Sequence, residues 1–450
     1  MFAYYLDLAF RSFKRNKALT ALMVLGIALG IGAAMTTLTV FHVLSGDPLP
    51  ERSHTLFYPQ LDPRSMDGFT PGDDPAYQMS RRDAENLLRD AKGDRQAVMT
   101  GGGLAVEPTT AGVSPFIVDA RYTSADFFPM FDTPFQYGSG WNKGSDDGRE
   151  RVAVISSELN ERLFGEADSV GRTVRLDGND FRIVGVLDDW RPTPRFYDMN
   201  LDRFGDVEQV FVPLSTAIDL TLGRNGSMDC WSAGDDAEDD PEGNIGLNAS
   251  CTWLQYWVEL RTPEQVEDYR QYLVNYSDAQ REAGRFERPT NVRLHDLMGW
   301  LEFNEVVPSD VRLQVWLAFG FLLVCLLNTV GLLLAKFLRR SSEIGVRRAL
   351  GASRRDIFAQ CLVEAGTIGL VGGAVGLGLA LLGLWAVRQQ PSSYAELAQL
   401  DPAMLMLTIV LAIVASVLAG LLPAWRACEV TPAIQLKSQY PNHWFPPSRE

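Results

Sequence analysis

The chain has 450 residues, 46% of them apolar, and its formal net charge of −15 excludes an ordinary basic nucleic-acid-binding protein. Length alone would suggest roughly two or three soluble domains, but four windows are almost free of charged residues. These are residues 18–44, 313–335, 365–387 and 403–424. Each is long enough for a helix to cross a hydrocarbon core of about 30 Å, so we predict four transmembrane helices.

A short basic segment precedes the first span. In residues 1–17 apolar side chains recur at helical spacing, and Arg11, Lys14 and Arg15 lie between them. This pattern predicts a cytoplasmic helix at the membrane interface. A cleaved signal peptide is the alternative for residues 18–44. That stretch is longer than the ~7–15 apolar residues of such peptides, and no small-residue cleavage motif closes it cleanly.

Lysine and arginine near the spans predict the orientation of the chain. They precede the first span, follow the fourth and are densest between the second and third, whereas the loop after the third span has only Arg388. Because basic loops stay on the cytoplasmic side, we expect both termini and residues 336–364 in the cytoplasm. Residues 45–310 and the short loop 388–402 are then outside, and residues 425–450 form a cytoplasmic tail.

The exterior segment, residues 45–310, is strongly acidic. It has 25 Lys and Arg against 48 Asp and Glu, a net charge of −23. Such a surface would suit a cationic ligand, but the plain need for solubility accounts for it equally simply, and we favour that interpretation.

The exterior segment is predicted to be a mixed α/β domain. Apolar alternation predicts strands over residues 116–122, 152–155, 173–176, 181–187, 210–214, 255–260 and 291–294. Helices are expected over residues 156–164 and 263–283, and Asp177-Gly178 between two strands indicates a hairpin. We expect two lobes, one made from both ends of the segment and one inserted between them.

The five cysteines divide between the two sides of the membrane. Cys230 and Cys251 lie in the exterior segment, and Cys325, Cys361 and Cys428 lie in the spans or at their inner side. Two cysteines that face an oxidising space suggest a disulfide, with two free buried thiols as the alternative.

Patterns typical of catalysis and metal binding are missing from the sequence. Its four histidines, none paired at metal-ligand spacing, are His42, His54, His295 and His443. Residues 165–173 come nearest to a Walker A motif, but they have one residue too many and Arg in place of Lys. The acidic run 235–242 lacks the ligand spacing of a calcium loop, so a solvated loop is expected there. We therefore predict no enzyme activity and no metal on this chain.

Two of the spans contain small residues four positions apart. The pairs are Gly26 and Gly30, Gly369 and Gly373, and Gly372 and Gly376. This spacing favours close helix contact, either within the chain or between subunits, although glycine is also simply tolerated in membranes. The four spans contain no Asp, Glu, Lys or Arg, which argues against a proton-coupled carrier.

The stretch between the second and third spans, SEIGVRRALGASRRDIFAQCLVEA, organises the cytoplasmic side. It predicts a short amphipathic helix, a turn at Gly351, and a second helix that Ser353 caps, with Asp356 in its first turn. A basic amphipathic helix between two spans either contacts lipid headgroups or docks on a soluble partner.

With these motifs placed, the chain resembles the FtsX-like permease family, and within it the MacB-type permeases with a periplasmic core domain. The most specific match is EIGVRRALGASRRDI, residues 343–357. Residues 120–131 and 151–187 are similar to the periplasmic core pattern of the family. Residues 422–437 resemble its C-terminal signature, although Trp425 stands where a basic residue is more usual.

The resemblance implies a permease subunit of a type VII ABC transporter in a bacterial inner membrane. Such permeases work as pairs, identical or paralogous, with two separate cytoplasmic ATPases that bind ATP and Mg²⁺, and the permease itself holds no cofactor. A periplasmic adaptor and an outer-membrane channel are further candidate partners. ATP-driven motion of the spans would pass to the periplasmic domain.

The resemblance also implies which residues contact the ATPase. They are Glu343, Ile344, Arg347, Arg348, Leu350 and Gly351. Arginines that only fix the orientation and bind anionic lipid are the alternative. The expected function is export of a peptide, an antibiotic or a similar amphiphile. Extraction of lipoproteins and control of a periplasmic hydrolase stay open.

Overall fold

The computed structural model describes residues 13, 17–108, 114–165, 167–231, 243–389 and 402–429. The chain divides into two compact units. Residues 46–306 form the α/β unit, and residues 1–45 together with residues 307–450 form the helical unit.

Several predicted segments lie largely outside the described residues. They are the interfacial helix of residues 1–17, the outer loop 388–402, the tail 425–450 and the acidic run 235–242.

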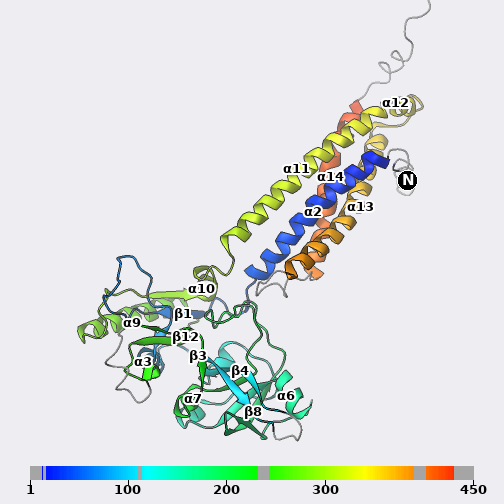
Figure 1. Ribbon diagram of the computed structural model, residues 1–450. Coiled ribbons are helices and arrows are strands. Elements are labelled where there is room, and N and C mark those ends of the chain that lie inside the picture. Colours follow the sequence, from blue (N-terminus) through cyan, green and yellow to red (C-terminus); the bar gives the residue numbers. More distant parts are fainter. Residues whose placement is uncertain are drawn as a thin grey trace, which may run out of the picture. The chain divides into compact units, whose positions relative to one another are not determined.

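Four helices of the described chain are long and apolar enough to cross a membrane (Figure 1). They are α2 (Lys17–Ser45), α11 (Ser309–Arg339), α13 (Arg354–Arg388) and α14 (Pro402–Glu429). A short helix, α12 (Ser341–Ala349), connects α11 to α13. The prediction of four apolar helices, with a mixed α/β domain between the first and the second, is confirmed.

Helix α2 packs against both α11 and α13, and α13 also packs against α14. Met23, Ile27 and Ile31 of α2 are buried in the core of this unit. The outward faces stay apolar and exposed, as at Leu22 and Trp316. Such faces are expected for helices surrounded by hydrocarbon.

The α/β unit contains a 13-stranded sheet within the described residues. Its strands are β1 (Leu56–Gln60), β2 (Met79–Ser80), β3 (Arg95–Val106), β4 (Phe116–Thr123), β5 (Phe135–Gly138), β6 (Val152–Ser156), β7 (Thr173–Leu176), β8 (Asn179–Leu187), β9 (Val210–Pro213), β10 (Arg224–Asn225), β11 (Asp229–Cys230), β12 (Cys251–Glu259) and β13 (Arg293–Asp296). Its helices are α3 (Arg81–Asp90), α4 (Phe127–Met130), α5 (Lys143–Asp147), α6 (Ser157–Phe164), α7 (Leu214–Asp219), the short η1 (Gly243–Ile245), α9 (Pro263–Glu282) and α10 (Leu297–Phe303).

The main strand order is β13-β1-β12-β3-β4-β9-β6-β8-β5. The first half of this order, β13-β1-β12-β3, contains strands from both ends of the α/β unit's sequence. The second half, β9-β6-β8-β5, contains strands from its middle. The division into two lobes stays a prediction.

Local sequence signals explain several element boundaries. The predicted hairpin is confirmed: Leu176 pairs with Asn179, and Asp177 and Gly178 between them both have positive φ. The oxygen of Ser156 accepts from the backbone N–H of Leu159 and caps α6.

The structure also contains strands and helices that the sequence patterns did not predict. Strand β3 includes three consecutive glycines, and its burial hides any alternation. At Gly102 a side chain would meet the ring of Tyr122, since its Cβ would lie 2.2 Å from Tyr122 Cζ. Glycine here makes room for a neighbouring ring, whereas a run of glycines in a sequence usually indicates a turn.

A buried cluster of charged residues lies beside β4. The Arg121 guanidinium bonds to Asp198 through Nη1, at 2.7 Å from Oδ2, and to Glu208 through Nη2. The Arg195 Nη1 lies 3.4 Å from Glu208 Oε1, and the Tyr197 hydroxyl donates to Glu208 Oε2 at 2.8 Å. Burial lowers the pKa of Arg121, but the two carboxylates raise it by more than burial lowers it. The net pKa of Arg121 is therefore raised, and the cluster is ionic.

Candidate functional site

The segment that joins α11 to α13 is the candidate site of the helical unit. Gly351, with φ +103°, makes the turn after α12, a conformation that few other residues adopt. Ser353 then begins α13 with a capping box. Its Oγ accepts from the Asp356 N–H at 3.2 Å, and the Asp356 carboxylate accepts from the Ser353 N–H at 3.2 Å.

One face of α12 is apolar and exposed. Val346 is 56% exposed and Leu350, just after the helix, is 83% exposed. Ala349 is exposed between them, and Gly351 follows. Residues three and four positions apart share a helix face, so Val346, Ala349 and Leu350 form one continuous strip, which we call the apolar strip.

The charged residues of α12 face the rest of the helical unit. The Glu343 Oε2 lies 3.1 Å from Arg340 Nε. The Arg347 Nη1 donates to Gln360 Oε1 at 2.8 Å, and the Arg348 Nη1 donates to the backbone carbonyl of Cys428 at 3.3 Å.

The six residues predicted to contact the ATPase are therefore divided between two faces of the segment. Ile344 is partly buried against the core of the unit, whereas Leu350 and Gly351 are exposed. Of the six, only Leu350 and Gly351 are exposed, and Val346 is exposed beside them. The exposed surface is accordingly more apolar than the sequence suggested, because long arginine side chains reach back to partners on neighbouring helices.

Two charged residues beside this segment were not singled out from the sequence. The Lys336 Nζ lies 2.7 Å from Glu364 Oε1, and the side chains are 0% and 4% exposed. Arg340 also reaches Glu364, with Nη1 3.2 Å from Oε2. Helical spacing of Lys336, Arg340, Glu343 and Arg347 was the available signal, since charges three or four positions apart share one face.

A cavity of about 20 Å³ lies among these side chains. It is lined by Phe337, Arg340, Glu343, Ile344, Arg347, Ile357, Gln360, Cys361 and Glu364. This volume is too small for a substrate, so the contacts here join helices to one another.

The glycines of the third predicted span lie at contacts within the chain. A Cβ on Gly369 would lie 1.8 Å from Ser416 Cβ of α14, and one on Gly373 would lie 2.5 Å from Ala412 Cβ. On the other side of α13, a Cβ on Gly372 would lie 2.9 Å from Ile27 Cγ2 of α2.

Of the three remaining predicted glycines, Gly376 and Gly30 also lie at close contacts within the chain. A Cβ on Gly376 would lie 3.1 Å from the Ala28 carbonyl oxygen, and one on Gly30 would lie 2.8 Å from Leu322 Cδ1. At Gly26 the nearest atom, Thr329 Oγ1, is 3.6 Å away, an ordinary contact. Most of the predicted glycines therefore lie at close contacts between helices of the same chain.

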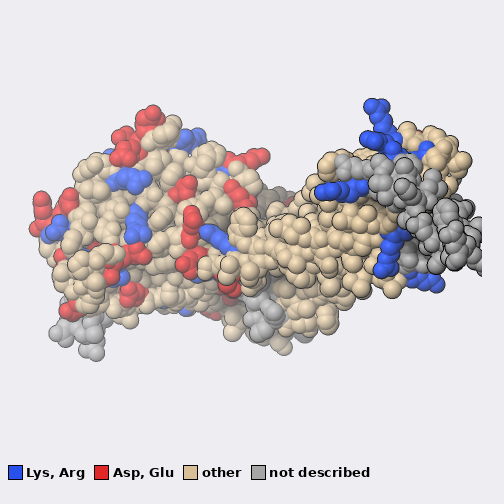
Figure 2. All heavy atoms as spheres, turned by 90° about the horizontal axis from the view of Figure 1, so that it is seen from above, with Lys and Arg blue, Asp and Glu red and all other residues tan. Residues whose placement is uncertain are grey.

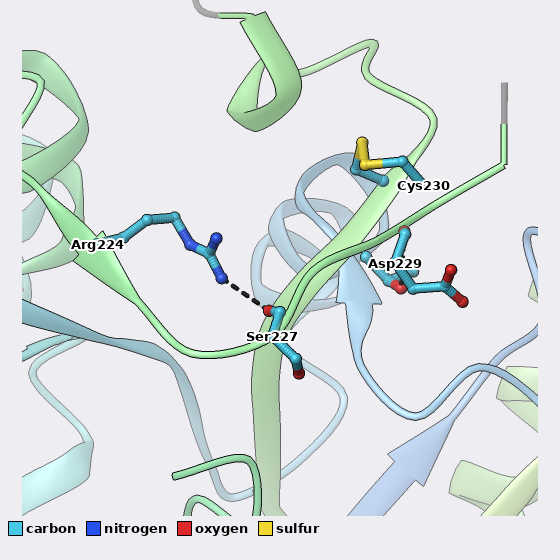
Figure 3. Close-up of a disulfide and its surroundings, with 6 residues drawn as sticks. Arg224, Ser227, Asp229 and Cys230 are labelled. Carbon is cyan, nitrogen blue, oxygen red and sulfur yellow. Dashed lines mark hydrogen bonds between the residues drawn. A yellow bond between two sulfur atoms is a disulfide. The ribbon is translucent and has the colours of Figure 1, made fainter. Parts of the chain in front are cut away.

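In the α/β unit, Cys230 and Cys251 form a disulfide that joins β11 to β12 (Figure 3). They are directly paired in the antiparallel register of the two strands. Nearby, the Arg224 Nη2 donates to the Ser227 carbonyl at 2.7 Å, a contact within the loop that leads into β11. Among the described residues, no group of three or more His, Cys, Asp or Glu side chains could hold a metal ion.

Charge differs between the two units. Acidic side chains are spread over the α/β unit, and basic side chains gather at one end of the helical unit (Figure 2). A basic end on a bundle of apolar helices is typical of the cytoplasmic side of a membrane protein.

Two family matches cover most of the chain. Residues 20–276 match the MacB-like periplasmic core domain, and residues 315–432 match the FtsX-like permease C-terminal domain. Neither is an ATPase domain.

Curated relatives are similar over nearly the whole chain. The macrolide export ATP-binding/permease protein MacB of Escherichia coli (strain K12) is 24% identical over 448 residues, 95% of this chain and 59% of that protein. The protein of the same name from Chlorobium luteolum is 23% identical over 446 residues, 97% of this chain and 60% of that protein. The chain spans about three fifths of the length of these curated relatives.

Two solved structures align with part of the chain. The periplasmic region of MacB from Actinobacillus actinomycetemcomitans is 13% identical, with a TM-score of 0.35, and the alignment covers 55% of this chain and 92% of that one. The extracellular domain of the noncanonic ABC-type transporter YknZ from Gram-positive bacteria is 11% identical, with a TM-score of 0.33, covering 54% and 98% respectively. The resemblance drawn from the sequence motifs is confirmed by the family matches, and the chain belongs to the family of multi-pass membrane permeases with a MacB-like periplasmic core domain and an FtsX-like permease domain.

Proposed function

We propose that this chain is a permease subunit driven by separate cytoplasmic ABC ATPases, which carry the ATP and Mg²⁺. The observation that carries the proposal is the apolar strip, whose residues Val346 and Leu350 are 56% and 83% exposed. An amphipathic helix buries its apolar face in a groove of a partner protein. In this chain, the ATPase would supply that groove.

Docking on a protein accounts for the strip better than binding to lipid headgroups does. Headgroup binding would need the α12 cations to point outward, but Arg347 and Arg348 donate to groups of the same unit. The exposed cations Arg354 and Arg355 begin α13. They support a cytoplasmic position for the segment and both termini.

We also propose a substrate class, by analogy with the relatives. The curated relatives are named for macrolide export, and for this chain we propose the broader class of a peptide, an antibiotic or a similar amphiphile taken from the periplasm. A second permease, identical or paralogous, would complete the transporter, and a periplasmic adaptor with an outer-membrane channel would complete the export path. Nucleotide would favour one arrangement of the spans by a few kcal/mol, and the periplasmic domain would follow.

The test is purification of the tagged full-length chain from its native membrane, with mass spectrometry of the proteins that accompany it. Leu350→Glu places a charge in the apolar strip and should reduce recovery of the ATPase by about tenfold or more, a change of about 1.4 kcal/mol. Ile117→Glu is a matched control, because Ile117 is 80% exposed and lies in the α/β unit. Its ATPase recovery should equal that of the wild type.

Other accompanying proteins distinguish the possible functions. An ATPase with an adaptor or outer-membrane channel supports export, whereas an ATPase with a cell-wall hydrolase and no channel supports a regulatory role. An ATPase with lipoproteins alone supports lipoprotein extraction. The wild-type chain recovered without any ATPase, under conditions that preserve other membrane complexes, would refute the proposal.

A further inference from the structure

Glu364 is the meeting point of two cations from different positions on the chain. Its Oε1 lies 2.7 Å from Lys336 Nζ of α11, and its Oε2 lies 3.2 Å from Arg340 Nη1 at the junction of α11 and α12. The carboxylate is 4% exposed and Lys336 is fully buried. A buried carboxylate with both oxygens paired fixes the geometry of its partners, because losing either contact leaves a charge in a medium of low dielectric.

Helix α12 is held to α13 at both of its ends. At its start, Arg340 Nε lies 3.1 Å from Glu343 Oε2 while its Nη1 contacts Glu364. At its end, the Arg347 Nη1 donates to Gln360 Oε1 at 2.8 Å. Gln360 and Glu364 are four residues apart on α13, so both contacts reach one face of that helix.

These contacts have a mechanical consequence. Helix α12 has nine residues, too few to hold a stable helix or a fixed direction without tertiary contacts. Its outward face carries the apolar strip and its inward face carries the contacts to α11 and α13. A force applied to the strip is therefore resisted by the Arg340–Glu364 and Arg347–Gln360 contacts, together with the Arg348 hydrogen bond to the Cys428 carbonyl.

We infer that Glu364 is a positioning residue that clamps α12 to α11 and α13, so that a displacement of α12 moves both helices together. The inference rests on the proposed function, in which an ATPase displaces α12. Without the clamp, α12 would still bind the ATPase through the apolar strip, but its movement would be lost at the joint.

The first test measures the clamp in the full-length chain alone, in lipid nanodiscs, by hydrogen–deuterium exchange. Glu364→Gln keeps the side-chain shape and removes its charge, and exchange of the amides of residues 341–349 should become about tenfold faster or more. Arg340→Gln leaves the Lys336–Glu364 pair in place and should also accelerate it. Arg355→Gln, at an exposed arginine of the same segment, is the matched control and should change nothing.

Amides in the middle of α2, which belongs to the same helical unit, report whether each variant has folded, and they should exchange at the wild-type rate. Unchanged exchange of α12 in both Glu364→Gln and Arg340→Gln would overturn the inference. This outcome is independent of any ATPase, so it separates failure of the clamp from failure of the proposed function.

The second test uses the complex purified with its ATPase. ATP with vanadate should alter exchange in α11 and α13 of the wild type. In Glu364→Gln it should not, although the ATPase is recovered at the wild-type level. A nucleotide response of normal size in Glu364→Gln would overturn the inference, because the pair would then merely hold two helices together. Recovery of no ATPase with the wild type would refute the proposed function and leave the first test valid.

Discussion

Replacing Arg121 by methionine tests whether the buried charged cluster stabilises the α/β unit. Arg121 and its partners Asp198 and Glu208 have side chains at most 1% exposed. Methionine retains the apolar stem of arginine and fills much of its volume. It leaves both carboxylates without their shared cation in the interior of the unit.

The size of the effect follows from burial. Removing one partner of a buried ion pair costs about 3–5 kcal/mol, because an uncompensated charge remains. In a unit of this size each kcal/mol lowers Tm by about 2–4 °C, so Arg121→Met should lower it by about 6–20 °C. The Arg149–Asp219 pair is a matched surface contrast, with side chains 61% and 45% exposed. Arg149→Met should cost less than about 1 kcal/mol.

The assay is thermal unfolding of the full-length chain in detergent, followed by tryptophan fluorescence. Trp253 and Trp257 are buried in the α/β unit and report its unfolding. Adding Asp198→Asn to Arg121→Met should recover part of the lost stability, because Asp198 loses its ion-pair partner in Arg121→Met whereas Glu208 keeps Arg195. Equal shifts in Arg121→Met and Arg149→Met would refute the reasoning, and no recovery in the double variant would attribute the loss to packing.

Three further predictions concern the two units. Changing Cys230 and Cys251 to alanine should destabilise the α/β unit by about 3 kcal/mol, since the disulfide closes a loop with a sequence separation of 21; an unchanged denaturation midpoint would contradict this. Gly369→Ala should destabilise the helical unit by about 1–3 kcal/mol. Its control is Gly366→Ala, where the new Cβ has open space around it. In thermal unfolding, the stability of this control should be unchanged or increased. Burial raises the pKa of Glu208, but the two adjacent arginines lower it by more than burial raises it, so the net pKa of Glu208 is lowered. The stability that this depressed pKa contributes is present above about pH 4.5 and lost below it, so the Tm difference between wild type and Glu208→Gln should be constant above that pH and shrink below it.

Properties set by long stretches of sequence were predictable. Twenty or more apolar residues have few alternatives to a spanning helix, so the four long helices follow from hydropathy. Local hydrogen-bonding signals were equally informative. Ser353 with Asp356 predicts the start of α13, and Asp177-Gly178 predicts the β7–β8 turn.

Properties set by contacts between distant residues were not predictable from the pattern. Strand β3 is buried on both faces, so it shows no alternation, and the need for glycine at Gly102 comes from Tyr122, a residue of the next strand. The direction of Arg347 likewise depends on Gln360, which lies on another helix. A sequence shows that an arginine is present, whereas its partner decides whether it faces a second protein or its own chain.

The contrast between the faces of α12 changes how its arginines are interpreted. Six arginines between residues 339 and 355 suggest an electrostatic docking surface, but charged contacts at an exposed interface contribute little affinity and are screened by salt. Burying Val346 and Leu350 instead would supply about 1.5–3 kcal/mol each, largely independent of salt. Recovery of the ATPase should therefore persist at high salt and fail in Leu350→Glu. Under the proposed function, Arg340 would anchor α12 through Glu364, and the contact of Val346 and Leu350 with the ATPase would pass its displacement to the anchored helix.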